Sequence, residues 1–201
     1  GYSTSDGILG DVSFSEKNFL GRGQYFKASV QYGQYQRGYQ FSFTEPYFLG
    51  YRVSAGFYVY LKQYLESQYR NFTEKNTGGT IRFGLPITEN LTFGVSYTIN
   101  QQQIGIATSQ RDGDFTNGEA SLAYMRYVCS TYPVGCTNFN RERLTSIPGI
   151  SLVYNTLDNM QMPHDGIFAK FTQEFAGAGG DAKFVRTTVD ARIYRELYAD
   201  W

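Results

Sequence analysis

The sequence has little of what most soluble proteins and helical membrane proteins contain. Its 201 residues include one His, one Trp, two Cys and five Pro. The 18 basic and 18 acidic residues leave no net charge, which excludes the basic surface typical of nucleic-acid-binding proteins. Charged residues make up 18% of the chain, less than the roughly 25% usual in soluble domains. No apolar run approaches the ~18 residues of a membrane-spanning helix.

The residues that are abundant favour β-structure. Glycine occurs 22 times, Tyr 18 times and Phe 16 times, while the mean hydropathy is −0.40. This aromatic content is too high for a disordered chain and is typical of strands. A polar average with a periodic apolar face is typical of a membrane β-barrel, which contacts lipid outside and water inside. The chain begins with Gly1 rather than Met, so we expect a processed or excised polypeptide.

The clearest strand signal lies in residues 91–99. Leu91, Phe93, Val95, Tyr97 and Ile99 alternate there with Thr, Gly and Ser, which is the period of two that a strand requires. The same alternation recurs along the chain. We therefore expect about ten strands, near residues 1–5, 8–18, 22–33, 37–44, 51–63, 76–86, 90–102, 147–157, 166–176 and 183–196.

The polar positions of these strands indicate what each face contacts. They carry mostly Ser, Thr, Gly and Gln, which suit a water-filled lumen, whereas the large aromatic residues suit lipid. The predicted fold is therefore all-β, an antiparallel transmembrane β-barrel. A soluble β-sandwich stays an alternative, because alternation does not show what the apolar face touches. Charged residues on the polar face predict lumenal ion pairs, or alternatively pore selectivity: Lys27, Lys62, Lys170, Glu174, Arg186, Asp190 and Arg192.

One connection is much longer than the others, at about residues 102–146. Long loops on one side and short turns on the other are typical of outer-membrane barrels, with the long loops extracellular. Within this loop, residues 117–127 predict a short helix that either rests on the membrane surface or caps the barrel mouth. Cys129 and Cys136 lie seven residues apart and predict a disulfide in an oxidising compartment; two free thiols are the alternative.

Several motifs, taken in their order, resemble the barrel of BamA-type outer-membrane assembly factors. They are the opening Gly1–Gly7, the segment Val12–Gln24, the Glu-Pro-Tyr-Phe element at Glu45–Phe48, and the pair Asn155–Asp158 and Pro163–Gly166. The resemblance covers nearly the whole chain. It implies a sixteen-stranded barrel preceded by periplasmic POTRA domains, of which residues 1–201 would supply strands one to about ten. We expect the POTRA domains, the C-terminal strands and the family's Val-Arg-Gly-Phe/Tyr motif to be absent from this chain.

The resemblance also implies a mechanism. In the family the first strand borders a weakly paired lateral seam, and a substrate strand adds to that edge by β-augmentation. The expected seam edge is Gly1, Tyr2, Ser3, Thr4 and Ser5, with a frayed terminus as the alternative. The implied partners are unfolded outer-membrane β-barrel substrates, outer-membrane lipid and accessory assembly lipoproteins, without nucleic acid. The implied location is the bacterial outer membrane, and no catalytic residue, cofactor or metal is expected.

Two other function classes deserve comparison with this one. A passive porin-like channel fits the same strand pattern. A barrel enzyme is suggested by His164 beside Asp165, which resembles a general base with its orienting carboxylate, although a simple turn residue is favoured at this Pro- and Gly-marked position. The carboxylates at Arg111–Asp114 and Asp158–Asn159 lack the ordered ligand spacing of a calcium loop.

Overall fold

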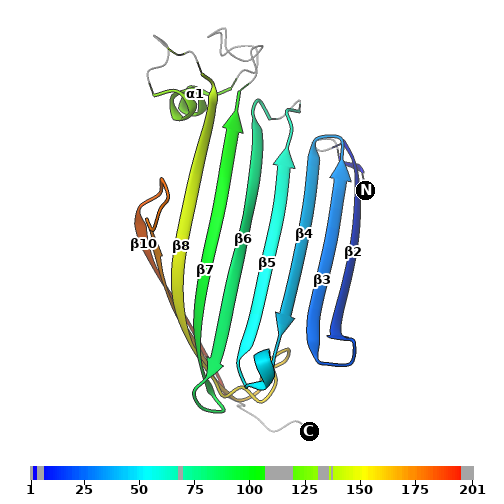
Figure 1. Cartoon of the computed structure of the whole chain (residues 1–201), viewed down its shortest axis with the longest axis vertical. Helices are drawn as coiled ribbons and strands as arrows, with labels where there is room; N and C mark the ends of the chain where they lie inside the picture. Colours follow the sequence, from blue (N-terminus) through cyan, green and yellow to red (C-terminus); the bar gives the residue numbers. More distant parts are fainter. Residues whose placement is uncertain are drawn as a thin grey trace. The chain divides into compact units, whose positions relative to one another are not determined.

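A computed structural model describes residues 2–3, 7–67, 70–106, 120–130, 136 and 138–195. Ten strands form one sheet in chain order from β1 to β10 (Figure 1). The pairs β1–β2, β2–β3, β8–β9 and β9–β10 are antiparallel. The strands are β1 (Tyr2–Ser3), β2 (Gly7–Phe19), β3 (Gln24–Gly33), β4 (Gln36–Glu45), β5 (Ser54–Tyr64), β6 (Thr73–Pro86), β7 (Leu91–Gly105), β8 (Asn140–Asn155), β9 (Gly166–Ala176) and β10 (Phe184–Tyr194).

These strands correspond to the ten that the alternation predicts, and the all-β antiparallel fold is confirmed. The largest difference is at β8, which begins at Asn140 rather than at 147. The predicted loop 102–146 is correspondingly shorter, since β7 continues to Gly105. Residues 140–145 read Asn-Arg-Glu-Arg-Leu-Thr, so polar side chains occupy both faces and no apolar period marks this part of the strand.

The chain divides into two compact units. Unit 1 contains residues 1–43, 58–79 and 99–144, and unit 2 contains residues 44–57, 80–98 and 145–201. Unit 1 holds the β2–β3 hairpin, in which Leu9–Glu16 pair with Phe26–Gly33 before the register shifts between Glu16 and Phe19. Unit 2 holds the β9–β10 hairpin, in which all eleven residues of β10 pair without interruption.

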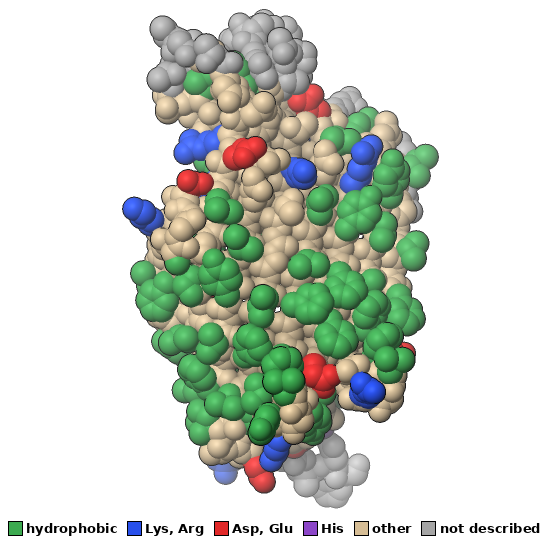
Figure 2. Space-filling model, viewed as in Figure 1, with side chains coloured by type: hydrophobic (Ala, Val, Ile, Leu, Met, Phe, Trp, Pro, Cys, Tyr) green, Lys and Arg blue, Asp and Glu red, His purple; other side chains and the backbone are tan. Residues whose placement is uncertain are grey.

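The alternation separates an apolar face from a polar face in each unit. On β7, the apolar-face side chains Val95, Tyr97 and Ile99 are each more than 40% exposed. Phe14, Phe26 and Phe41 form a row of ring contacts on β2, β3 and β4. Figure 2 shows hydrophobic side chains gathered over the face of the strands that it displays. Such a large exposed apolar surface requires lipid or another apolar partner to cover it.

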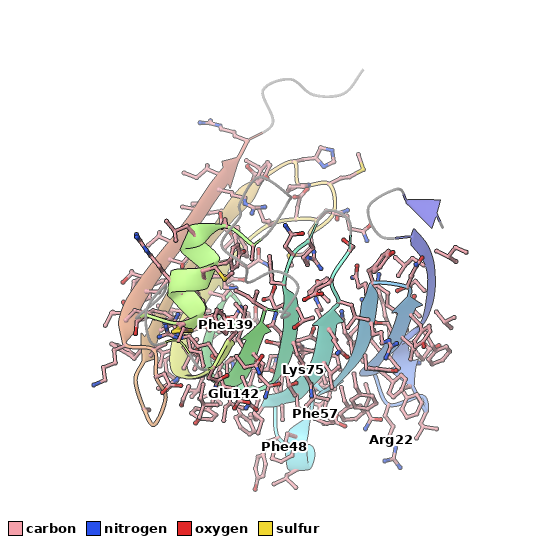
Figure 3. All side chains as sticks on the ribbon, turned by 90° about the horizontal axis from the view of Figure 1, so that it is seen from above. Arg22, Phe48, Phe57, Lys75, Phe139 and Glu142 are labelled. Carbon is pink, nitrogen blue, oxygen red and sulfur yellow. A yellow bond between two sulfur atoms is a disulfide. The ribbon has the colours of Figure 1, made fainter. Side chains whose placement is uncertain are left out.

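The buried hydrophobic cluster of the described residues lies in unit 1, around the helix α1 (Leu122–Val128). It contains Ile104, Ile106, Ala120, Met125 and Val128, with Phe72, Tyr127 and Phe139 packed against it. Figure 1 shows α1 beside the ends of β7 and β8, and Figure 3 shows Phe139 beside the helix. Within the described ranges, no helix has the length and apolar character needed to cross a membrane.

Candidate functional site: an open strand edge and the groups around it

The predicted seam strand lies at one end of the strand order. Tyr2 pairs with Ile8 and Ser3 pairs with Gly7, which joins β1 to β2. Gly1, Thr4 and Ser5, the other predicted seam residues, lie outside the described residues. Gly7 has a φ of 70°, and a Cβ added to it would lie 2.6 Å from Gln34 Oε1. A glycine is therefore suited to this position, because its backbone adopts a positive φ without steric cost.

Backbone hydrogen bonding indicates which groups of β1 face outward. The Gln34 amide donates to the Ile8 carbonyl at 3.2 Å, so the peptide groups of Ile8 are directed toward β3. Neighbouring residues of a strand direct these groups to opposite sides. The backbone N–H and C=O of Gly7 are therefore directed toward β1, where Gly7 pairs with Ser3. By the same alternation, the backbone N–H and C=O of Tyr2 point away from β2. Among the described strands β1 is the first of the order, so these groups form the free edge of that sheet.

The other end of the strand order is β10, in unit 2. Its apolar-face side chains Val185, Val189 and Ile193 are between 68% and 76% exposed, whereas Val95 within β7 is 45% exposed. The difference follows from position, since an edge strand has a covering neighbour on one side only. Unpaired edges of this kind are templates for a further strand.

The polar face of unit 2 carries charged side chains that the sequence predicts for this face. Arg186 Nε donates to Glu174 Oε2 at 2.6 Å, and Arg192 Nη2 donates to Asp190 Oδ2 at 2.8 Å. These pairs agree with the expectation of ion pairing on the polar face.

Small polar residues occupy the rest of this face. Thr80 and Thr98 share a hydrogen bond of 2.9 Å, and Arg82 Nη2 donates to Thr44 Oγ1 at 3.0 Å. A cavity of about 280 Å³ is lined by Thr44, Arg82 and Lys170, and its other lining residues include Ser54, Gly84, Thr92, Gly94, Ser96, Ser151 and Thr172. This composition is that of a hydrated barrel interior.

The polar face of unit 1 is cross-linked by side-chain hydrogen bonds. Gln102 Nε2 donates to Glu74 Oε1 at 2.8 Å, and Tyr60 Oη lies 3.1 Å from Asn100 Oδ1. The Tyr58 and Tyr60 rings stack, with centroids 5.3 Å apart. These hydrogen bonds run between β5, β6 and β7, so they fix the strands to one another through side chains as well as through the backbone.

Helix α1 packs on this same polar face. Gln102 and Ile104 of β7 line a hollow with Ala123, Tyr124 and Tyr127 of the helix. The polar face of a β-barrel lines the lumen, so α1 lies on the lumenal side of the strands. Of the two positions that the sequence left open for the predicted helix, this one corresponds to capping the mouth. Residues 117–119 of that predicted helix lie outside the described residues.

Contacts that the sequence pattern did not reveal hold α1 in place. Arg141 Nη1 donates to the Tyr127 carbonyl at 2.6 Å, and its guanidinium lies 4.8 Å from the Tyr127 ring centroid. The Phe72 and Tyr124 rings stack at 4.3 Å. Directly after the helix, the sulfur atoms of Cys129 and Cys136 are bonded, with Cα atoms 6.1 Å apart. The partners of α1 on the strands are distant in sequence, so no local signal indicates them. The disulfide is the one that the two closely spaced cysteines predict.

The Asn-Thr-Leu-Asp and Pro-His-Asp-Gly motifs form the two sides of one turn in unit 2. Asp158 Oδ1 accepts backbone hydrogen bonds from His164 at 3.0 Å and from Asp165 at 3.3 Å. The hydrogen bond from the His164 amide is the main cause that lowers the pKa of Asp158 below its ordinary value. His164 Nδ1 lies 3.5 Å from Asp158 Oδ2, so its carboxylate neighbour is Asp158 and not the adjacent Asp165. These contacts give His164 and both motifs a role in shaping the turn.

Comparison with known proteins gives a consistent result. The model of the Omp85 superfamily domain matches residues 18–201. The chain is similar to the outer membrane protein assembly factor BamA of Nitratidesulfovibrio vulgaris, with 27% identity over 98% of this chain and 22% of that protein. It is 24% identical to the outer membrane protein assembly factor BamA of Neorickettsia risticii, over 95% of this chain and 23% of that protein.

The fold comparison agrees with the sequence comparison. The crystal structure of BamA from Haemophilus ducreyi lacking POTRA domains 1–3 matches with a TM-score of 0.60 and 19% identity. The match covers 92% of this chain and 34% of that one. The present chain thus spans about a fifth of the length of the curated relatives that it matches.

Proposed function

This chain belongs to the Omp85 superfamily of outer-membrane β-barrel proteins, and on that premise we propose that it forms part of the machine that folds and inserts other β-barrels. Its curated relatives are named as outer membrane protein assembly factors. We propose that the ten strands are the first part of a larger barrel, with POTRA domains and further strands elsewhere in the polypeptide. The partners of the complete protein are unfolded β-barrel substrates, outer-membrane lipid and accessory lipoproteins.

The observation that carries the mechanism is the free edge of β1. The N–H and C=O of Tyr2 face away from β2, as the bond from Gln34 to Ile8 implies. An incoming substrate strand can satisfy both groups by β-augmentation. In a bilayer each unsatisfied backbone group costs several kcal/mol, so a substrate strand that pairs with the edge is stabilised relative to one that enters lipid alone.

Strand templating needs no chemical step. The free energy comes from burial and hydrogen bonding of the substrate, so neither a nucleotide nor a catalytic residue takes part. His164 belongs to the turn that Asp158 organises, and we assign it no part in catalysis.

A depletion and rescue experiment tests the function. Cells depleted of their endogenous assembly factor receive the protein at full length, as wild type or with Tyr2→Pro or Tyr2→Phe. The wild type and Tyr2→Phe should restore folded porins, seen as heat-modifiable bands, while Tyr2→Pro should not, because proline removes the outward N–H. Ion conductance without restored assembly by the wild type would instead favour the porin-like channel.

A further inference from the structure

The apolar face of unit 1 contains a hollow of about 440 Å³. Its walls are side chains from three neighbouring strands: Ala28 and Val30 of β3, Tyr39 and Phe41 of β4, and Val59 and Leu61 of β5. The methyl group of Ala28 leaves space beside the larger Phe41 ring. In an outer-membrane protein this face meets lipid, so the hollow is shaped for a hydrocarbon chain.

A polar pocket adjoins this hollow on the same face. It measures about 310 Å³, and its lining from this face includes Gln63, Thr73, Lys75, Gln103, Asn140 and Glu142. The lining also includes Glu74, Ile104 and Arg141, which belong to the polar-face positions. Leu61 and Gln63 are successive apolar-face positions of β5, and Thr77 and Lys75 are successive positions of β6. On β5 the wall therefore changes from apolar to polar within one step, and on β6 it changes from an uncharged to a charged side chain. Figure 3 labels Lys75 and Glu142.

Two cations lie at the level of this change. The Leu65 amide donates to the Tyr35 carbonyl at 2.8 Å, and antiparallel pairing then places Arg37 of β4 opposite Gln63 of β5. Lys75 of β6 lines the pocket beside Gln63, so Arg37 and Lys75 stand two strand spacings apart, about 10 Å. An anionic group between these positions is within reach of Lys75, and of Arg37 when its guanidinium turns from the Tyr32 ring toward β5.

Neither cation is neutralised by a carboxylate among the described residues. The Arg37 guanidinium rests 5.1 Å from the Tyr32 ring centroid, and its buried Nε has no hydrogen-bond partner in the part of the chain that the structure describes. Lys75 is exposed and forms no ion pair within those same residues. An anion at this level would be attracted by the positive charges of both side chains.

The pocket has two acidic residues, Glu74 and Glu142, and both accept hydrogen bonds from side-chain amides. Gln102 Nε2 donates to Glu74 Oε1 at 2.8 Å. Gln103 Nε2 donates to Glu142 Oε1 at 3.0 Å, and Gln101 Nε2 donates to Glu142 Oε2 at 3.2 Å. Gln103 lines the pocket, and because its Nε2 is bonded to Glu142, its Oε1 is the atom that accepts hydrogen bonds. The pocket therefore offers acceptors for hydroxyl groups beside cations for a phosphate.

We propose that this part of the wall is a binding site for a membrane lipid whose headgroup carries a phosphate and hydroxyl groups. The acyl chain occupies the hollow beside Ala28, the phosphate lies between Arg37 and Lys75, and the headgroup hydroxyls donate to Gln103 Oε1. The site is distinct from the β1 edge. It would hold one lipid at a fixed place on the wall and so set the depth of the strands in the leaflet.

The test measures lipid binding to the full-length protein, folded in detergent, by native mass spectrometry. Phosphatidylglycerol supplies the phosphate and hydroxyl groups, and phosphatidylcholine, which lacks the hydroxyls and is zwitterionic, is the comparison lipid. The variants are Lys75→Gln, Lys75→Arg and Ala28→Phe. Lys62→Gln is the matched control, because it removes the same charge from the opposite face of the neighbouring strand β5. Heat-modifiable mobility identifies the folded protein in each case.

We expect one phosphatidylglycerol to bind more tightly than phosphatidylcholine. Lys75→Gln should weaken phosphatidylglycerol binding about five-fold, the contribution of one basic residue near an anionic lipid. Lys75→Arg and Lys62→Gln should leave it unchanged, and Ala28→Phe should weaken binding of both lipids by filling the hollow. Equal losses in Lys62→Gln and Lys75→Gln would overturn the proposal, as would competition by glycerol phosphate, which has no acyl chain, at the same concentration as the lipid.

Discussion

Replacing Met125 with alanine tests how α1 is held against the strands. The Met125 side chain is fully buried, at 0% exposure, within the cluster that joins the helix to Ile104 and Ile106. Truncation of a buried Met to Ala typically costs about 2–5 kcal/mol. The helix has seven residues, too few for stability in isolation. The lost contacts should therefore release the helix locally, while the hydrogen-bonded sheet stays folded.

The lower end of that range, about 2 kcal/mol, corresponds to a roughly 30-fold larger opening equilibrium. Trypsin cleavage after Arg126, within α1, reports this opening, because proteolysis follows the population of the open form when reclosing is fast. We expect cleavage of Met125→Ala in outer-membrane vesicles to be about 30 times faster than that of the wild type. Leu122→Ala is the matched control, since Leu122 is 39% exposed on the same helix. Equal cleavage rates in the two variants would refute the assignment of Met125 as the anchor.

The turn in unit 2 supports two further predictions. The pKa of Asp158 is lowered in the folded state, so the stability that its carboxylate adds to the turn is complete above the unfolded pKa of about 3.8 and is lost as the pH falls through the folded pKa. The His164 backbone amide should then exchange hydrogen faster. In Asp158→Asn the same amide should exchange fast already at pH 7. Gly166→Ala should lower the urea midpoint of the folded barrel, because φ is 120° at this position and the added Cβ would collide with the Thr156 carbonyl oxygen. We expect the free energy of unfolding to fall by about 1–3 kcal/mol. Gly179→Ala, at φ 87° with no atom within 4 Å, should cost less, and an equal loss would contradict the steric argument.

The strands could be predicted from the sequence because each face of a barrel has a single environment. In residues 91–99 the apolar side chains, such as Val95 and Ile99, lie on the lipid face, and Ser96 and Thr98 lie on the polar face. The sequence of this strand therefore shows the period of two directly. The signal weakens where a strand leaves the apolar zone. The first residues of β8 carry charge on both faces, and for that reason the alternation predicts a start seven residues too late.

The contacts around the site depend on tertiary structure and gave no local signal. Arg141 reaches Tyr127 across 14 residues, and His164 pairs with Asp158 rather than with its neighbour Asp165. The motifs at Asn155–Asp158 and Pro163–Gly166 indicate the family, but they do not indicate which side chains are in contact. The outward direction of the Tyr2 peptide groups required the register of β1, β2 and β3 together.

Site-specific crosslinking at β1 tests the central claim most directly. The full-length protein would carry Tyr2→Cys, and a substrate barrel stalled during assembly would carry a single cysteine in its last strand. Val95→Cys is the control, because Val95 is 45% exposed on the apolar face but lies within the interior strand β7. We expect a disulfide crosslink from position 2 and none from position 95. Efficient assembly with no crosslink at position 2, or equal crosslinking at both positions, would contradict templating at the β1 edge.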